Sequence, residues 1–205
     1  MELVVLFGPE HGLQGQAQTG ETVSNNPTAS SLYGKTRFLT PDMLQNVDAL
    51  VYDIQDVGTR FYTYISTLFE SMNKAVQMGI PLMVLDRPNP IDAMRTEGPV
   101  LESGYKSFVG IYPIPIRHGM TVGELAMLFN QESHIGCDLK IVPIHRWKRS
   151  QWYDQTALHW ILPSPNMPRP LLRCLSRSGP DRRYKPFRGP WHHPSFRTHG
   201  GALGK

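Results

Sequence analysis

Short apolar runs alternate along the chain with longer segments in which apolar residues recur at helical spacing. The apolar runs predict strands over residues 2–8, 48–56, 81–90 and 137–144. The amphipathic segments predict helices over residues 40–47, 61–79 and 120–133. A polar loop is expected over residues 25–38, and a second loop runs through Tyr112. The first run, ELVVLFG, is apolar after its first residue, which is typical of a strand buried on both faces.

Residues that favour helix ends stand at the borders of these helical segments. Thr40 and Pro41 suit the N-cap and the first helical position, where the N–H that proline lacks would be unpaired anyway. Gly79 is expected to end the second helix in the left-handed conformation. Thr121 and Glu124 have the spacing of a capping box, so a structural role is expected for Glu124.

The order of strands and helices predicts the fold class. Strands separated by helices form βαβ units with right-handed crossovers, and such units build a parallel sheet. We therefore expect an α/β protein with a mostly parallel sheet and flanking helices. Ligands of open parallel sheets bind beyond the carboxyl ends of the strands.

Polar clusters stand at that edge after three of the predicted strands. They are Glu10–His11, Asp53–Arg60 and Asp86–Asn89. Because the carboxyl ends of parallel strands share one edge of the sheet, these loops are expected to converge on a single crevice. The sequence therefore predicts a ligand site there.

Glu10 and His11 form the sharpest of the three clusters. They lie in the stretch GPEHG, where Gly8 and Gly12 permit a tight turn that a Cβ atom would obstruct. A carboxylate in such a turn can act as general acid, general base or nucleophile, and His11 can hydrogen-bond to it and shift its pKa. The structural alternative is that Glu10 is an N-cap or turn residue.

The second cluster supplies Asp53, Asp56, Arg60 and Tyr62 as candidate substrate-binding residues. Arg60 is expected to hold a substrate carboxylate through a two-pronged hydrogen bond. The alternative for this cluster is a set of turn caps with an internal Asp–Arg ion pair.

Later segments add further candidates. Those for substrate binding are Asp86, Arg87, Asn89, Arg117, His118 and Asn166. Glu97, an isolated acid in a Gly-Pro loop, is a candidate second carboxylate. Asn89 in its Asn-Pro turn and His118 before a helix are equally explained as turn and cap residues. Asn166 lies in the rigid loop LPSPNMP, from which it could reach a sugar hydroxyl.

Composition and missing motifs exclude several classes of function. The 205 residues are 40% hydrophobic, and no apolar run approaches the roughly 18 residues of a membrane span, so no membrane partner is expected. The first residues do not resemble a signal peptide. There is no G-x-G-x-x-G, P-loop, H-E-x-x-H or G-x-S-x-G motif, so no cofactor is expected. Cys137 and Cys174 have no metal-binding spacing, and no metal site is expected.

Charge is distributed unevenly. Residues 169–205 hold nine Lys and Arg against one acid, whereas residues 1–168 hold 12 against 16. A basic arm ordinarily indicates nucleic-acid binding. This tail, however, is rich in Arg, Pro, Gly and His without periodicity, as out-of-frame translation of a GC-rich gene would be. When residues 174–203 are translated back into all their possible codons, a reading frame that starts at the second base of each codon can encode a continuous peptide.

We therefore expect a frameshift after Pro168, so that an out-of-frame, disordered basic tail over residues 169–205 follows one domain over residues 1–168. The alternative is a genuine disordered basic tail. A nucleic-acid or metal role for His192, His193, His199 and Trp191 is accordingly not expected.

Six motifs up to Pro168 resemble the NamZ family of exo-β-N-acetylmuramidases, glycoside hydrolases that were long classed as a domain of unknown function. They are LFGPEHGLQG, VYDIQDVGTRFYTY, LDRPNP, EGPVLE, PIRHGMTVGELA and LPSPNMP. The resemblance implies a Rossmann-like N-terminal domain that bears a catalytic glutamate, followed by a smaller domain that helps to bind substrate. It further implies a chain incomplete at both ends, without the first βα unit and the C-terminal domain, and hence a defective fragment.

The resemblance also implies the reaction and its residues. Family members release N-acetylmuramic acid from the non-reducing ends of peptidoglycan fragments, so the expected partners are MurNAc-GlcNAc saccharides, in an extracellular or periplasmic location of a bacterium. Glu10 is the leading catalytic residue and Glu97 its expected partner. Arg60, Arg87 and Arg117 are candidates for binding the lactyl carboxylate of muramic acid.

Two other classes of function stay open at this point. One is a non-catalytic sugar-binding Rossmann-like module, in which Glu10 is only a turn residue. The other is a metal-dependent hydrolase, whose ligands would come from Asp53, Asp56, Asp86, His11 and His118.

Overall fold

A three-stranded parallel sheet organises the computed structural model, which describes residues 2–9, 29–32, 38–164 and 167. Its strands are β3 (Leu50–Tyr52), β4 (Leu82–Leu85) and β7 (Leu139–Val142), in the order β3-β4-β7. Helix α1 (Tyr64–Met78) connects β3 to β4, and α2 (Val122–Glu132) lies between β4 and β7. The predicted α/β class with a parallel sheet is therefore confirmed.

The caps predicted for the two long helices are present. Gly79 ends α1 at φ +66°, and its backbone N–H reaches the last-turn carbonyls. Thr121 caps α2: its Oγ1 accepts from the Glu124 N–H at 3.2 Å, while its own N–H donates to Glu124 Oε2 at 2.9 Å. The capping box and the structural role of Glu124 are confirmed.

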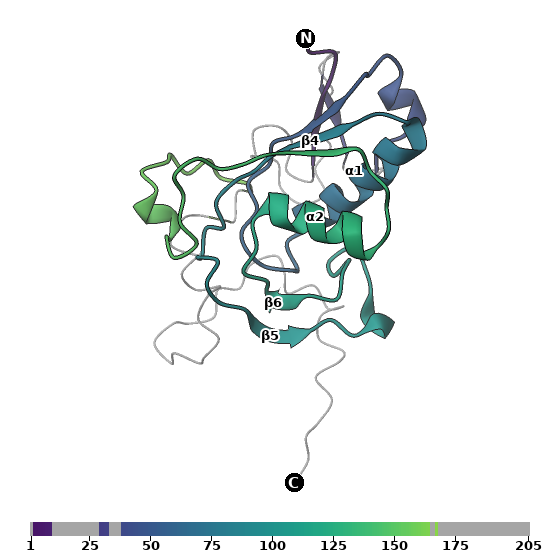
Figure 1. The fold of residues 1–205 in the computed structure, drawn as a ribbon. Coiled ribbons are helices and arrows are strands. Elements are labelled where there is room, and N and C mark those ends of the chain that lie inside the picture. The colour runs from purple at the N-terminus through teal and green to yellow at the C-terminus, as the bar shows by residue number, and fades with distance from the viewer. Residues whose placement is uncertain (1, 10–28, 33–37, 165–166, 168–205) are drawn as a thin grey trace.

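Both helices pack on the same face of the sheet, and Figure 1 shows α1 and α2 next to each other, below β4 in this view. The alternate positions Leu50, Tyr52, Leu82 and Val84 contribute to one buried cluster together with apolar residues of both helices. The opposite face of the sheet carries Val51 and Val142, which are exposed among the described residues.

The first predicted strand is shorter and more exposed than expected. Strand β1 covers only Leu6–Gly8 and pairs in parallel with β2 (Ala29–Ser31), which lies inside the segment predicted to be a polar loop. Leu3, Val4 and Leu6 are exposed, so the prediction of burial on both faces is wrong. An apolar run is buried on both faces only where a layer packs against each of them.

The predicted helix over residues 40–47 is a single 3₁₀ turn, η1 (Pro41–Leu44). Thr40 has the extended backbone of an N-cap, but its side chain makes no capping hydrogen bond. The segment has too few residues to continue into an α-helix, and Leu44 alone is buried.

An antiparallel hairpin was missed between residues 91 and 118. Strand β5 (Glu97–Val100) pairs with β6 (Pro115–Arg117), with Glu97 opposite Arg117 and an irregular register between the two paired ends. These strands are three and four residues long and contain prolines, so they carry no alternating pattern. Short 3₁₀ turns lie nearby at η2 (Ser103–Tyr105) and further on at η3 (Tyr153–Gln155).

A second apolar cluster lies beneath the loops. It consists of Val57, Tyr62, Tyr64, Ile91, Tyr153, Trp160 and Met167. Its members come from the segments that follow β3, β4 and β7, so this cluster holds together the loops at the carboxyl edge of the sheet. Among the described residues, no helix is long and apolar enough to cross a bilayer.

Candidate functional site

The loops that follow β3, β4 and β7 meet at the carboxyl edge of the sheet. Gln55 Nε2 donates to the Pro88 carbonyl at 3.0 Å, and the Tyr153 N–H donates to the Pro90 carbonyl at 3.2 Å. The second and third polar clusters therefore lie together, as the topology predicted. Glu10, His11 and Asn166 lie outside the described residues.

Asp53 and Arg87 form an ion pair between two of these loops. Asp53 Oδ1 accepts from Arg87 Nε at 2.7 Å and lies 2.6 Å from Nη2. Their side chains are 46% and 33% exposed, so both reach solvent at the rim. The Asp–Arg ion pair considered for the second cluster exists, but its arginine comes from the loop after β4.

Asp86 anchors the start of α2. Its Oδ1 accepts from the Gly123 N–H at 2.7 Å and the Arg87 N–H at 3.0 Å, and its Oδ2 accepts from Thr121 Oγ1 at 2.9 Å. Burial raises the pKa of this carboxyl, and the hydrogen bonds partly offset that effect. A carboxylate that accepts from three donors at a helix N-terminus has a structural role, and substrate binding by Asp86 stays a prediction.

Asn89 is also structural. It is buried, its Nδ2 donates to the Met120 carbonyl at 2.9 Å, and its Oδ1 accepts from the Ile91 N–H at 3.1 Å. The turn that packs against it contains Gly58 at φ +84°, where a Cβ atom would lie 2.5 Å from Asn89 Oδ1. The substrate-binding expectation for Asn89 is therefore corrected in favour of its turn alternative.

Asp56 and His118 form a buried pair. The Met120 N–H donates to His118 Nδ1 at 3.2 Å, which places the ring proton on Nε2, 3.3 Å from Asp56 Oδ2. The Nε2–Oδ2 contact is close but not aligned as a hydrogen bond. Asp56 Oδ2 also accepts from the Gly58 N–H at 2.7 Å. Because both side chains are buried, direct contact with substrate is not supported for either of them.

Asp56 still has one open acceptor. Within the described residues, its Oδ1 is buried without a hydrogen-bond partner, as are Gln55 Oε1 and Thr59 Oγ1 in the same loop. Such atoms are costly to bury, so further donors at this place would stabilise the loop after β3.

Arg117 lies at the centre of a second buried polar group. Its guanidinium is 3% exposed, with Nη2 at 2.9 Å from Asp92 Oδ2 and Nη1 at 3.3 Å from Glu97 Oε2. Nη2 also donates to the Ile91 carbonyl, and Cζ lies 5.8 Å from the centroid of the Trp152 ring. Two internal acids neutralise Arg117, which gives it a structural role, and its binding of a lactyl carboxylate stays a prediction.

Arg60 and Tyr62 also point inward. Arg60 Nη1 donates to the Pro99 carbonyl at 2.8 Å and to the Ile114 carbonyl, which ties the loop to the β5–β6 hairpin. Burial lowers the pKa of this guanidinium. The Tyr62 ring lies in the second apolar cluster, 4.7 Å from the Tyr64 ring, and burial raises its pKa. Tyr62 is therefore a core residue, and the substrate-binding expectation for it is corrected.

Glu97 is the described carboxylate that best fits a catalytic position. It lies at the start of β5, is 27% exposed, and is held from the opposite strand by Arg117. A partly exposed carboxylate fixed by a buried cation is positioned to face a ligand without moving.

Two side chains near Glu97 were not singled out in the sequence. Arg95 lies two residues before it and is exposed, and Trp152 is half-buried in the loop after β7. No motif distinguishes either of them, although their positions after strands at the carboxyl edge could have marked them for inspection.

The metal-site hypothesis gains no support. Each described acid in its ligand set has a different internal partner, as given above for Asp53, Asp56 and Asp86. Among the described residues, no three His, Cys, Asp or Glu side chains lie where they could hold one ion.

A shallow surface depression of about 670 Å³ lies away from these loops. It is lined by Met127, Asn130, His134 and Leu139, at the end of α2 and the beginning of β7. Because it lies at the amino edge of the parallel strands, it is not the predicted crevice.

Comparison with known proteins shows which family and which relatives this chain resembles. The family model described as "Exo-beta-N-acetylmuramidase NamZ, N-terminal" matches residues 1–171. The peptidoglycan beta-N-acetylmuramidase NamZ of Bacillus subtilis (strain 168) is 56% identical over 174 residues. That alignment covers 82% of this chain and 42% of the curated relative.

Solved structures agree with the fold. A crystal structure of a DUF1343 family protein from Bacteroides fragilis NCTC 9343 is 46% identical and superposes with a TM-score of 0.74. It covers 82% of this chain, which corresponds to 44% of that protein. A second DUF1343 structure from the same organism is 36% identical with a TM-score of 0.61, over 73% of this chain and 41% of that one.

Proposed function

Because this chain belongs to the NamZ exo-β-N-acetylmuramidase family through its N-terminal domain, we propose that it carries the catalytic part of a glycoside hydrolase. The reaction is release of N-acetylmuramic acid from the non-reducing ends of peptidoglycan fragments, with MurNAc-GlcNAc saccharides as substrates. The observation that carries the proposal is 56% identity to the B. subtilis peptidoglycan beta-N-acetylmuramidase. Convergence of the loops after β3, β4 and β7 at one edge of the sheet supports it.

Glu10 is the proposed principal catalytic carboxylate, with His11 beside it in sequence, and Glu97 is the proposed second carboxylate. The support for Glu97 is its partial exposure and the Arg117 contact that fixes it. A separation of about 5–5.5 Å between the two carboxyls gives a retaining reaction, and about 6.5–9.5 Å leaves room for the water of an inverting one. Observing the first anomer of the product by NMR distinguishes these mechanisms.

The substrate-binding part of the proposal rests on fewer residues than the sequence suggested. Asp53 and Arg87 remain at the rim, and Arg60, which contacts the β5–β6 hairpin, is partly exposed. Asn166 stays a proposed contact for a sugar hydroxyl. The enzyme is proposed to act in the extracellular space or periplasm of a bacterium. Recovery of the protein in the cytosolic fraction after cell fractionation would contradict this location.

A chimera tests the catalytic assignment. Residues 1–168 of this chain replace the matching part of the B. subtilis relative, and release of the chromophore from a MurNAc glycoside is measured. We expect turnover by the chimera, loss of turnover in the Glu10→Gln variant, and full turnover in the control Glu102→Gln, which alters an exposed glutamate outside the site. Undiminished turnover in Glu10→Gln would rule out the assignment.

A non-catalytic sugar-binding module is the second candidate. The observation that favours it is the occupancy of the described carboxylates: Asp53, Asp56, Asp86 and Glu97 all contact internal donors or cations. Binding of the sugar by the chimera without any turnover would favour this module. Loss of turnover on adding a chelator would instead revive the metal-dependent hydrolase.

A further inference from the structure

The arginines expected to bind the lactyl carboxylate are already engaged inside the protein. Arg60 donates to backbone carbonyls, Arg87 is paired with Asp53, and Arg117 is neutralised by two acids. Among the arginines of the described residues, only Arg95 and Arg146 have side chains for which the structure shows no hydrogen bond or ion pair. A guanidinium without an internal partner is the group that can offer both prongs to a ligand carboxylate.

Arg95 is placed beside the proposed catalytic carboxylate. It lies in the exposed segment that leads into β5, two residues before Glu97. The neighbouring Met94 is 64% exposed, so the segment offers an apolar contact next to the cation. The Arg95 backbone passes close to Gly119, where an added Cβ would lie 2.7 Å from the Arg95 carbonyl oxygen.

Trp152 borders the same region from the loop after β7. Its backbone forms an antiparallel bridge with Ile91, and its ring lies over the Arg117 guanidinium at 5.8 Å. Trp152 is half-buried and also packs against the second apolar cluster, and the Arg117 guanidinium beside its ring is buried. A half-buried indole backed by a fixed cation is a rigid platform.

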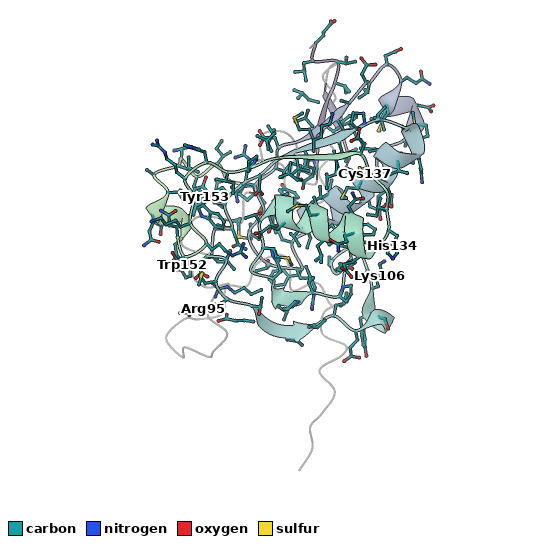
Figure 2. The ribbon with its side chains drawn as sticks, viewed as in Figure 1. Arg95, Lys106, His134, Cys137, Trp152 and Tyr153 are labelled. Carbon is teal, nitrogen blue, oxygen red and sulfur yellow. The ribbon has the colours of Figure 1, made fainter. Side chains whose placement is uncertain are left out.

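Arg117 contacts both the Glu97 carboxylate and the Trp152 ring, and these contacts fix the position of the ring relative to the carboxylate. Figure 2 shows Arg95 and Trp152 on the same side of the molecule, away from His134 and Cys137. Arg95 lies two residues before Glu97 in the chain, and Glu97 is linked to Trp152 through Arg117, so a cation, a carboxylate and an aromatic ring come from this one region.

We propose that Arg95 and Trp152 form the subsite for N-acetylmuramic acid, an inference that rests on the proposed function. Trp152 packs its exposed indole against the apolar C–H face of the sugar ring. Arg95 binds the lactyl carboxylate through paired hydrogen bonds, which N-acetylglucosamine cannot make because it lacks the lactyl group. Arg95 therefore sets the preference for muramic acid, and Trp152 supplies affinity common to both sugars.

Titration of the 205-residue chain with each free sugar, followed by NMR or calorimetry, tests this assignment. In Arg95→Gln we expect affinity for N-acetylmuramic acid to fall about tenfold or more, with affinity for N-acetylglucosamine unchanged. The matched control is Arg146→Gln, which removes the other unpaired guanidinium and should change neither affinity. Trp152→Leu should weaken both sugars, and Trp152→Phe, which retains an aromatic face, should restore most of both.

The outcomes separate this inference from the proposed function. If the chain prefers N-acetylmuramic acid and Arg95→Gln keeps that preference, the subsite is wrong while the proposed reaction stands. If the chain binds neither sugar but the chimera hydrolyses the MurNAc glycoside, the subsite is again wrong, since it requires recognition by these residues. Failure of both binding and turnover overturns the subsite and the function together. Loss of the preference in Arg95→Gln, with Arg146→Gln unaffected, supports the subsite.

Discussion

Arg117→Met tests whether this arginine is structural or ligand-binding. The substitution keeps most of the apolar stem but removes the guanidinium that contacts Asp92 at 2.9 Å and Glu97 at 3.3 Å. Asp92 is 8% exposed, so the change leaves a buried carboxylate without its cation. Breaking a buried pair in this way costs about 3–5 kcal/mol of unfolding free energy. At about 2–4 °C per kcal/mol for a chain of this size, the midpoint of thermal unfolding should fall by about 6–20 °C.

The matched control is Arg87→Met, which breaks the ion pair with Asp53. Because those side chains are 33% and 46% exposed, solvent screens the pair and its loss should cost about 0–1 kcal/mol. In the double variant Arg117→Met with Asp92→Asn, the buried charge is removed as well, so part of the lost stability should return.

Urea unfolding followed by far-ultraviolet circular dichroism measures all four proteins. The structural assignment would be refuted by an Arg117→Met variant that unfolds within about 1 kcal/mol of wild type. If that variant also lost binding of N-acetylmuramic acid while Arg95→Gln retained it, Arg117 would be the residue that meets the lactyl carboxylate.

Four further substitutions test the loops and the helix ends. Burial raises the pKa of Asp86, so its protonated form favours the folded state: this contribution is full below the ordinary carboxyl pKa and is lost as pH rises through the folded-state value. Asp86→Asn should therefore remove a decline in unfolding free energy that begins near the ordinary carboxyl pKa of about 4 and continues as pH rises, and an unchanged pH slope in urea titrations would contradict this. Thr121→Ala should cost about 1 kcal/mol through loss of the N-cap, seen as a lower urea midpoint. Gly58→Ala should lower the unfolding free energy by about 3 kcal/mol or more, because φ is +84° and the new Cβ would meet Asn89. Gly79→Ala, at φ +66° with open space around it, should lower it by only about 1 kcal/mol. Equal shifts of the thermal unfolding midpoint in the two variants would refute this comparison.

The predicted polar clusters show where reasoning from sequence stops. The topology correctly placed the loops after β3 and β4 at one edge, because parallel strands must leave the sheet on the same side. It did not indicate that Asp86 and Asn89 would turn away from the crevice. Besides one nearby backbone N–H each, their partners lie 31 to 37 residues further along the chain, and no local pattern records such a pairing.

The arginines illustrate the same limit. Arg60, Arg87 and Arg117 stand in conspicuous motifs and are used internally, whereas Arg95 stands in no motif and shows no side-chain partner among the described residues. Whether a guanidinium is available to a ligand depends on the acids and carbonyls that folding brings to it. For Arg117 those groups are 20 to 26 residues away in sequence.

The sequence alone determined the parallel α/β class, the two long helices, the left-handed Gly79 cap and the Thr121–Glu124 capping box. These features depend on residue periodicity and on contacts within about four residues, so they can be read locally. Only the tertiary structure decided that both helices cover one face of the sheet, that β5 and β6 pair, and that Arg117 is buried against Asp92 and Glu97. Those outcomes depend on contacts between distant segments, whose energies are set by burial and mutual geometry rather than by any one stretch of sequence.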